Sequence, residues 1–227
     1  MLKVTLLDYT PEPEKLVAAA ARLCYSSQGA DELMDSFTPE KVQSFVQKLV
    51  SLGHESPMEH VSFTFAVSGI SRACSHQLVR HRVGVSFSQK SQRYVKEKQF
   101  EYVTPPKVAA NPELKAKFDK AMAGAQAVYE ELLTAGVPAE DARFVLPNAA
   151  STSLVVTMNV RSLWHFFQLR CCNRAQWEIR TLANAMLAEV REVAPLLFAK
   201  AGATCDSLGV CFEGAMSCGK CKNVLSR

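Results

Sequence analysis

The chain has 227 residues, of which 48% are hydrophobic and 21% charged, so it can bury a sizeable core and is not a disordered tail. A net charge of +4 is too small for general nucleic-acid binding, although it suits a site that collects phosphate groups. No apolar run approaches the roughly 20 residues that cross a bilayer, and the first residues do not resemble a signal peptide. We therefore expect a cytoplasmic protein that binds neither membrane nor nucleic acid.

The spacing of apolar residues predicts helices and a few short strands in the first half of the chain. Thr38-Pro39-Glu40 is a typical helix start, with Thr at the cap and Pro in the first turn, and Gly53 is a typical stop. The predicted elements are a strand at 2–7, a helix at 13–25, a helix from 39 to the stop at Gly53, a strand at 61–67 and a helix from Ser71 to about His81, followed by a polar segment at 82–94.

The second half predicts one long helix, a strand and two more helices. Asn111-Pro112-Glu113 opens the long helix, which ends at Gly136. A β-branched strand follows at 152–158, then helices at about 161–171 and 174–193. We find no repeat and no linker. The predicted fold is a single mixed α/β domain at 1–203, with a small, mostly antiparallel sheet and several long helices, followed by a Cys-rich tail at 204–227.

Eight cysteines are unusual at this length, and in a reducing compartment they more often stay thiols or bind metal than form disulfides. Cys205, Cys211, Cys218 and Cys221 crowd the tail with gaps of five, six and two residues, and only the last gap is typical of a zinc site. We predict no bound metal and favour a redox-labile or unpaired thiol tail. The residue pattern itself leaves metal binding and redox activity both open.

The densest polar stretch runs from Arg80 to Tyr94 and holds three arginines, three serines and two glutamines within fifteen residues. Arginine side chains match phosphate or carboxylate oxygens, and serine hydroxyls add neutral donors. The plainer interpretation is a solvated basic loop. Because Val85 and Phe87 lie within the stretch, we place its charges at the edge of a core.

Two further segments carry polar groups in suggestive places. His54-Glu55-Ser56-Pro57-Met58-Glu59-His60 lacks the second His of a zinc-protease helix at the required position, and its Pro forbids the helix interior, but it suits polar ligand contacts. Arg161 and Arg170 lie in an otherwise apolar, aromatic-rich helix, and Arg143 precedes an apolar run. Each of these arginine side chains would cost several kcal/mol if it were buried without a partner, so they need partners or anionic ligands.

Glycine motifs of Rossmann, P-loop and α/β-hydrolase sites are absent from the sequence.

The segment RHRVGVSFSQKSQRYV, in which eight residues separate RHR from Ser91, resembles the signature of the flavin-dependent thymidylate synthases, the ThyX family. HESPMEH, ARFVLP, NVRSLWHFFQLR and AQWEI resemble the family's other blocks, in the family's order, over roughly residues 15–200. The eight-residue spacing is the longer of two forms that the family tolerates. Gln89 stands where some members carry Glu.

The resemblance implies a ThyX-like catalytic domain that methylates dUMP to dTMP. Methylenetetrahydrofolate would be the carbon donor, FAD would carry the hydride and NADPH would supply it. The family assembles as a homotetramer with active sites built between subunits, and it uses no catalytic cysteine. A zinc-stabilised RNA-binding module is the alternative, against which the chain has no recognisable RNA-binding motif.

The resemblance also implies a role for individual residues. Arg170 would lie beside uracil and favour loss of the N3 proton, and Ser91 would hydrogen-bond the nucleotide. Residues 77–80 and Arg170 would come from one subunit, and residues 89–93 with Arg143 from another. The residues implied to bind dUMP are Gln77, Leu78, Val79, Arg80, Gln89, Lys90, Ser91, Gln92, Arg93, Arg143 and Arg170. Those implied to contact FAD are Ser56, Arg80, His81, Arg82, Gln89, Asn159, Val160, Arg161 and His165.

Overall fold

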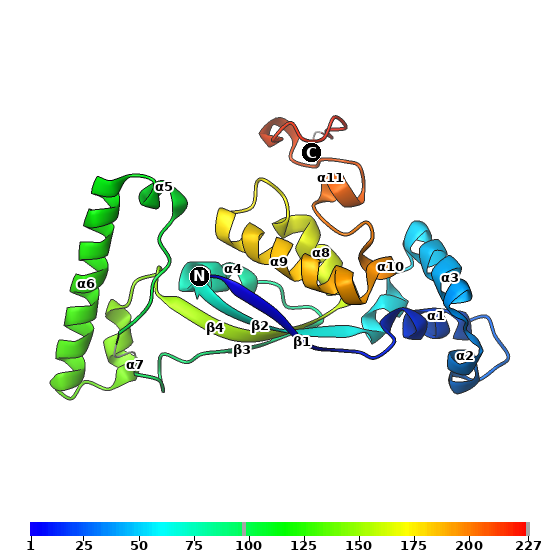
Figure 1. Ribbon diagram of the computed structural model, residues 1–227, viewed down its shortest axis with the longest axis horizontal. Helices are drawn as coiled ribbons and strands as arrows, with labels where there is room; N and C mark the ends of the chain where they lie inside the picture. The colour runs from blue at the N-terminus through cyan, green and yellow to red at the C-terminus, as the bar shows by residue number, and fades with distance from the viewer. Residues whose placement is uncertain (97–98, 226–227) are drawn as a thin grey trace. The chain divides into compact units, whose positions relative to one another are not determined.

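A computed structural model describes residues 1–96 and 99–225 (Figure 1). Its sheet has four strands in the order β1-β2-β4-β3. The strands are β1 (Lys3–Tyr9), β2 (Ser62–Ser71), β3 (Val85–Gln89) and β4 (Ser151–Asn159). Helices and sheet together make the mixed α/β fold that the sequence predicts.

Backbone hydrogen bonds fix the direction of the strands. Asn159 N donates to Gly84 O at 3.1 Å and Lys90 N donates to Ser153 O at 2.9 Å, so β3 and β4 run antiparallel. Val160 N donates to Val61 O at 3.0 Å and Arg72 N to Ala150 O at 2.9 Å, which makes β2 and β4 antiparallel as well. The predicted antiparallel arrangement is confirmed.

The polar segment predicted at 82–94 contains strand β3, which the sequence analysis did not predict. Val85, Phe87 and Gln89 are half-buried, whereas Ser86 and Ser88 between them are exposed. This period of two is the strand pattern, but serine and glutamine at three of five positions make it look like a loop.

The described residues group into two compact units, and strands β2 and β4 pass from one to the other. Unit 1 comprises Met1–Lys3, Val67–Arg80 and Phe87–Val155, and unit 2 comprises Val4–Ala66, His81–Ser86 and Val156–Arg227. The expected division into 1–203 and 204–227 concerns independent folding and stays a prediction.

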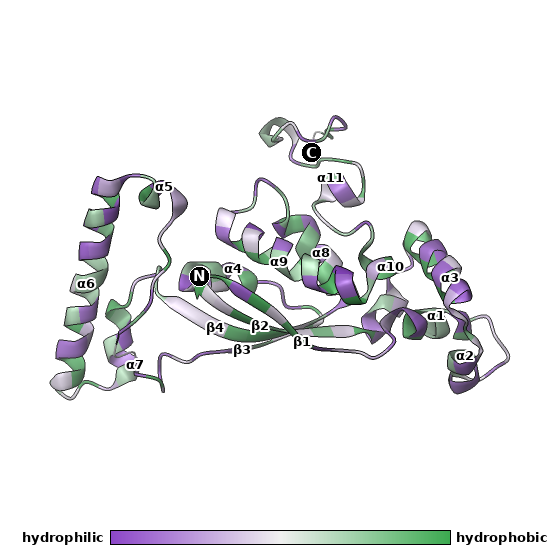
Figure 2. Cartoon of the chain, viewed as in Figure 1, coloured by the Kyte–Doolittle hydropathy of each residue, from purple (hydrophilic) through white to green (hydrophobic). Residues whose placement is uncertain are grey.

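Unit 1 contains the long predicted helix α6 (Pro112–Thr134), whose turns alternate hydrophilic and hydrophobic in Figure 2. The Asn111 side chain caps it by accepting from Glu113 N and Leu114 N. Met122 and Tyr129 are its buried residues, and Met122 packs with Phe100 and Ala150. The other helices of unit 1 are α4 (Arg72–Leu78), α5 (Pro106–Ala109), α7 (Ala139–Ala142) and the 3-10 turn η2 (Arg143–Val145).

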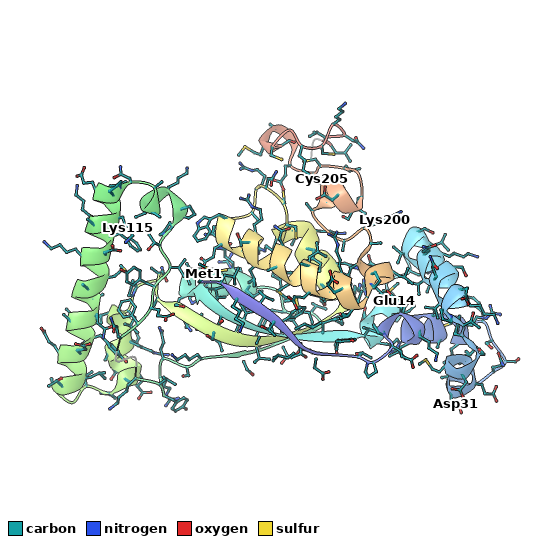
Figure 3. The ribbon with its side chains drawn as sticks, viewed as in Figure 1. Met1, Glu14, Asp31, Lys115, Lys200 and Cys205 are labelled. Carbon is teal, nitrogen blue, oxygen red and sulfur yellow. The ribbon has the colours of Figure 1, made fainter. Side chains whose placement is uncertain are left out.

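Unit 2 holds most of the buried aromatic core. The ring of Phe198 lies 5.4 Å from that of Phe63 and 6.1 Å from that of Phe167, both edge-on. Glu14, labelled in Figure 3, accepts a 2.6 Å hydrogen bond from Leu196 N. The helices of unit 2 are α1 (Pro13–Leu23), α2 (Ala30–Ser36), α3 (Pro39–Leu52), η1 (Ser56–His60), α8 (Val160–Arg170), α9 (Trp177–Val193), α10 (Pro195–Phe198), α11 (Thr204–Ser207) and η3 (Gly214–Met216).

The predicted helices are present, with corrected ends. The helix expected from Ser71 to His81 stops at Leu78, and the one expected from 174 begins at Trp177 because the Gln176 side chain caps it. Helix α2 was not predicted. In the described ranges 1–96 and 99–225, each helix is too short or too polar to span a bilayer.

Candidate functional site

Gln89, the last residue of β3, is anchored within unit 1. Its Nε2 donates to Ser75 Oγ at 3.0 Å and to Thr152 Oγ1 at 3.2 Å, and both hydroxyl residues are buried. These two bonds use both hydrogens of the amide nitrogen. The amide oxygen is therefore the group that Gln89 would offer to a ligand, as an acceptor.

Two of the predicted arginines meet at Glu140 of α7, also in unit 1. Arg93 Nε donates to Glu140 Oε2 at 2.6 Å, and Arg143 Nε donates to Glu140 O at 3.1 Å. The Arg93 side chain is 54% exposed. Because exposed ion pairs contribute only about 0–1 kcal/mol, a ligand anion can compete with Glu140 for Arg93.

Arg72, the first residue of α4, lies close enough to Arg143 for the two charges to interact. It was not among the predicted site residues. Burial and the positive charge of Arg143 lower the pKa of Arg72. Like charges held close together cost free energy, and an anion placed near them would recover it. Neither a motif nor the family resemblance marked Arg72, which lies ahead of the polar stretch at 80–94.

Ser91 lies in the turn that follows β3. Its Oγ accepts a hydrogen bond from Arg93 N at 3.1 Å, and Ser91 O accepts from Val95 N at 3.0 Å. A hydroxyl that accepts in this way keeps its own hydrogen for donation. Ser91 is thus oriented as a hydrogen-bond donor.

Arg170, the last residue of α8, pairs with a histidine in unit 2. Arg170 Nε donates to His81 Nε2 at 3.0 Å, and the His81 ring stands edge-on to Phe166 at 5.0 Å. Burial, then the charges of Arg170 and His165, lower the pKa of His81 to about 4. His81 is therefore neutral at pH 7, so it orients the guanidinium without cancelling or adding charge.

The loop before β3 packs on the first turn of α8. Asn159 Oδ1 accepts from Ser162 N at 2.9 Å as the helix cap, and Ser162 Oγ donates to Val83 O at 2.6 Å. Gly84 has φ +64°, and a Cβ there would lie 2.4 Å from Asn159 Nδ2. Only glycine fits this close contact between residue 84 and Asn159. The contact fixes the backbone next to Arg82.

Arg161 and the predicted contact Ser56 are brought to the same region of unit 2. Arg161 Nε donates to Glu55 Oε2 at 3.0 Å, and its Nη1 donates to Glu59 Oε1 at 2.5 Å. Glu55 directly precedes Ser56, the first residue of η1. These three side chains are about half exposed, so Arg161 remains accessible to an anionic ligand.

The predicted site residues fall into two groups, one in each unit. Leu78 and Val160 are fully buried, so only their backbone could meet a ligand. Unit 1 holds Gln77, Leu78, Val79, Arg80, Gln89, Lys90, Ser91, Gln92, Arg93 and Arg143. Unit 2 holds Ser56, His81, Arg82, Asn159, Val160, Arg161, His165 and Arg170. Most residues predicted to bind dUMP thus lie in unit 1, and most residues predicted to contact FAD lie in unit 2.

Comparison with known proteins gives relatives over nearly the whole chain. Residues 5–196 match the family described as "Thymidylate synthase complementing protein". A protein named flavin-dependent thymidylate synthase from Geobacter sulfurreducens is 54% identical over 225 residues, which cover 98% of this chain and 96% of that protein. One of the same name from Clostridium tetani is 51% identical over 235 residues, covering 96% of this chain and 94% of that protein.

A solved structure is also similar. It is a UMP/dUMP methylase, PolB, from Streptomyces cacaoi bound with 5-Br dUMP, with a TM-score of 0.74 and 25% identity. The match covers 88% of this chain and 93% of that one. None of these three relatives is described as an RNA-binding protein, so they give no support to the zinc-stabilised alternative.

Proposed function

Because the chain belongs to the family of flavin-dependent thymidylate synthases, we propose that it methylates dUMP to dTMP. Methylenetetrahydrofolate is the carbon donor in this proposal, FAD the bound hydride carrier and NADPH the reductant. The observation that carries the proposal is Arg170, whose guanidinium is held by a neutral His81 at 3.0 Å. A fixed positive charge of this kind suits an anion formed on uracil.

Arg170 acts on the base. A guanidinium beside uracil stabilises the N3 anion and so lowers the pKa of the N3 proton. The negative charge spreads through the ring to C5, which becomes nucleophilic towards the one-carbon donor without a covalent bond to the enzyme. His81 is a positioning residue here, since it reaches the base only through Arg170.

The arginines of unit 1 hold the phosphate. Arg93 and Arg143 share Glu140, and Arg72 lies near enough for the charge of Arg143 to lower its pKa. A phosphate dianion would relieve that repulsion and accept paired N–H bonds from the guanidiniums. Ser91 donates a hydrogen bond to the nucleotide and is not a nucleophile.

The polar groups of unit 2 suit a flavin dinucleotide. Arg82 and His165 are exposed and Arg161 is about half exposed, and His81 is neutral. Guanidinium groups match a pyrophosphate, and flat imidazoles can pack on a flat ring. Ser56, His81, Arg82, Asn159, Arg161 and His165 would hold FAD, with the backbone of Val160. Arg80 and Gln89 complete the set of FAD contacts that the resemblance implies. When bound, FAD supplies hydride transfer.

The remaining parts of the proposal concern assembly and location. In the homotetramer that we propose, Arg170 and Arg93 reach one dUMP from different subunits. The location is the cytoplasm, where the nucleotide, the folate and NADPH are the partners.

The test is a reconstituted reaction with the purified chain. We expect flavin absorbance on the protein and dTMP formation that stops when dUMP, methylenetetrahydrofolate or NADPH is left out. A Gly124→Ala variant, changed on α6 where an added Cβ meets nothing within 4 Å, should be as active as the wild type. A protein that binds no flavin and forms no dTMP would contradict the proposal, and stoichiometric zinc with RNA binding would favour the alternative.

A further inference from the structure

A cavity of about 210 Å³ in unit 2 is lined by six cysteines. They come from two places: the end of α8 supplies a pair, and the C-terminal tail supplies the rest. The lining also includes Gln168 and Leu169 of α8, just before Arg170. The six are Cys171, Cys172, Cys205, Cys211, Cys218 and Cys221. All are free thiols, and the methylation chemistry uses none of them.

The thiols of this cavity differ in reactivity. Burial raises the pKa of Cys171 to about 12, which leaves it protonated and inert. Cys218 is exposed. A hydrogen bond from the backbone of Lys220, followed by one from the Asn173 side chain at 3.5 Å, lowers the pKa of Cys218. Because the thiolate is the nucleophile, Cys218 is the reactive member.

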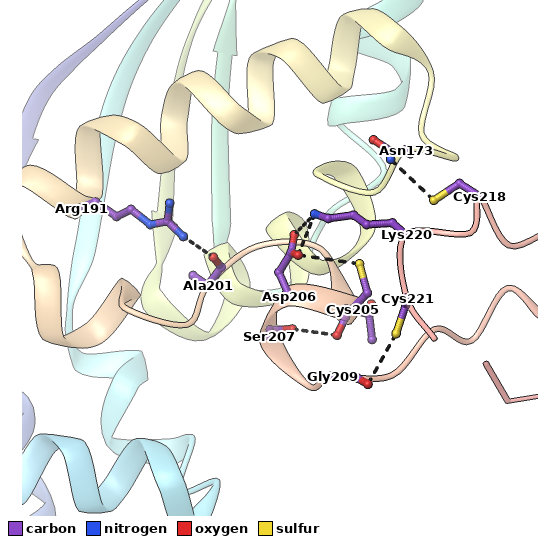
Figure 4. Close-up of polar contacts among 11 residues, drawn as sticks. Asn173, Arg191, Ala201, Cys205, Asp206, Ser207, Gly209, Cys218, Lys220 and Cys221 are labelled. Atoms are coloured by element: carbon purple, nitrogen blue, oxygen red, sulfur yellow. Dashed lines mark hydrogen bonds and ion pairs between the residues drawn. The ribbon is translucent and has the colours of Figure 1, made fainter. Parts of the chain in front are cut away.

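Two residues separate Cys221 from Cys218, and hydrogen bonds hold the turn between them. Gly219 has φ +81°, and its N donates to Ser217 Oγ at 3.3 Å. The Cys221 thiol can donate its one hydrogen to either of two carbonyl oxygens, Gly209 O at 3.5 Å, as Figure 4 shows, or Asn223 O at 3.4 Å. Two cysteines separated by two residues are the arrangement used in thiol–disulfide exchange.

A metal ion is the competing occupant of a cysteine-lined cavity. Among residues 1–96 and 99–225, no three His, Cys, Asp or Glu side chains are grouped closely enough to hold one. The thiols are also engaged separately: Cys218 with Asn173, Cys221 with Gly209, and Cys205 with Asp206 at 3.9 Å (Figure 4). The arrangement favours sulfur exchange over coordination.

We propose that Cys218 and Cys221 form a thiol–disulfide exchange site for small disulfides. The Cys218 thiolate attacks one sulfur of a small disulfide RSSR, forms a mixed disulfide and expels RS⁻. The Cys221 sulfur then attacks Cys218 Sγ and expels the second RS⁻. The two protein protons end on the two leaving thiolates, so one dithiol and one RSSR give one protein disulfide and two RSH.

The exchange has a structural consequence within unit 2. The Asn173–Cys218 contact joins the tail to the segment after α8, and Lys220 pairs with Asp206 at 2.7 Å in the same turn. Closing the disulfide draws Cys218 Sγ away from Asn173, which removes one attachment of the tail to the end of α8. This inference does not rest on the proposed methylation, because its readout is the state of the sulfurs.

The experiment treats the full-length protein with glutathione disulfide and maps the products by mass. Wild type should lose two hydrogens, with the bond located between Cys218 and Cys221. Cys221→Ser should instead accumulate one glutathione on Cys218, and Cys218→Ser should give neither product in the tail. Cys24→Ser, at an exposed thiol outside the cavity, is the matched control and should behave as wild type.

Several outcomes would overturn the proposal. Glutathione that stays on wild-type Cys218 would show that Cys221 does not resolve the mixed disulfide. Modification of Cys24 as fast as Cys218 would show that the cavity confers no reactivity. Stoichiometric zinc that protects the tail thiols would establish the metal site instead.

A second variant tests the geometry without changing a cysteine. Asn173→Ala removes a hydrogen bond to the Cys218 sulfur, so the modification rate of Cys218 at pH 7 should fall by about two- to fivefold. Asn184→Ala removes a comparable side-chain bond, to Arg180 O on α9, and should leave the rate unchanged. Equal rates in both variants would remove Asn173 from the proposal.

Discussion

The most informative single side chain is His81, because its charge state decides what Arg170 can do. A protonated imidazole could not accept the Nε–H of Arg170, and it would place a second positive charge at 3.0 Å. Burial and the charge of Arg170 hold the pKa of His81 at about 4 and prevent this. His81, the middle residue of the RHR segment, is therefore a neutral hydrogen-bond acceptor that orients Arg170.

Arg170 gives the sharpest prediction for catalysis. Arg170→Ala should abolish methylation while the protein stays folded and keeps most of its flavin, because the uracil anion loses its counter-charge. Arg170→Lys keeps the charge without the planar guanidinium, so it should recover little activity. Initial rates of dTMP formation, with flavin content measured on the same samples, check this. Wild-type turnover in the Ala variant would contradict the assigned role.

Ser91 separates hydrogen bonding from covalent catalysis. If Ser91 donates to the nucleotide, Ser91→Ala should cost about 1–3 kcal/mol, mostly as weaker dUMP binding. Turnover at saturating dUMP should then be largely retained. Steady-state kinetics over a range of dUMP concentrations distinguish the roles. Complete loss of turnover with normal dUMP binding would mean that Ser91 is a nucleophile.

The depressed pKa of His81 predicts a pH dependence of stability. The unfolded chain binds a proton at His81 near pH 6.5, whereas the folded chain does so only near 4. The unfolded state therefore binds more protons between these values, and stability falls as pH drops from 6.5 to about 4. Urea unfolding at pH 7.5 and 5 should show this loss, and His81→Asn should reduce it. His76→Asn, at an exposed histidine, should keep the full loss.

The contact between the loop at Gly84 and helix α8 holds in place residues that we propose to bind FAD. Gly84→Ala should destabilise the protein by about 1–3 kcal/mol, because it forces a positive φ on alanine and crowds Asn159. Gly124→Ala in α6 is the matched control, since a Cβ there meets nothing within 4 Å. That change should be neutral or slightly stabilising. Equal unfolding midpoints for the two variants would remove the requirement for glycine at 84.

Elements defined by local chemistry could be predicted from the sequence. The caps at Thr38 and Asn111 hydrogen-bond within three residues of themselves, so the sequence alone marks these helix starts. Strand β3 could not be predicted, because its identity depends on pairing with β4. The same limit applies to the site. Glu55 and Arg161 are 106 residues apart in sequence, and only the fold brings them together.

Across the described chain, the two compact units do not follow chain order. Strands β2 and β4 belong partly to each unit, so no single cut of the chain separates them. Composition therefore gave no boundary, and the sequence predicted one domain. The same interleaving distributes the proposed nucleotide residues, with Arg93 and Arg143 in unit 1 and Arg170 in unit 2.

In the assembly that we propose, one dUMP site draws Arg170 and Arg93 from different subunits. Each contact is then reciprocal between paired subunits. We would mix Arg170→Ala with Arg93→Ala, each inactive alone, and let their subunits exchange by unfolding and refolding. Arg93 is exposed, so its loss should not impair folding.

Random reassortment leaves about a quarter of the sites with both arginines, because each site needs an intact Arg170 from one chain and an intact Arg93 from another. We therefore expect dTMP formation to return to about one quarter of the wild-type rate, while each variant carried alone through the same refolding stays inactive. A mixture that remains inactive, with subunit exchange confirmed by mass, would show that the site is not built between chains.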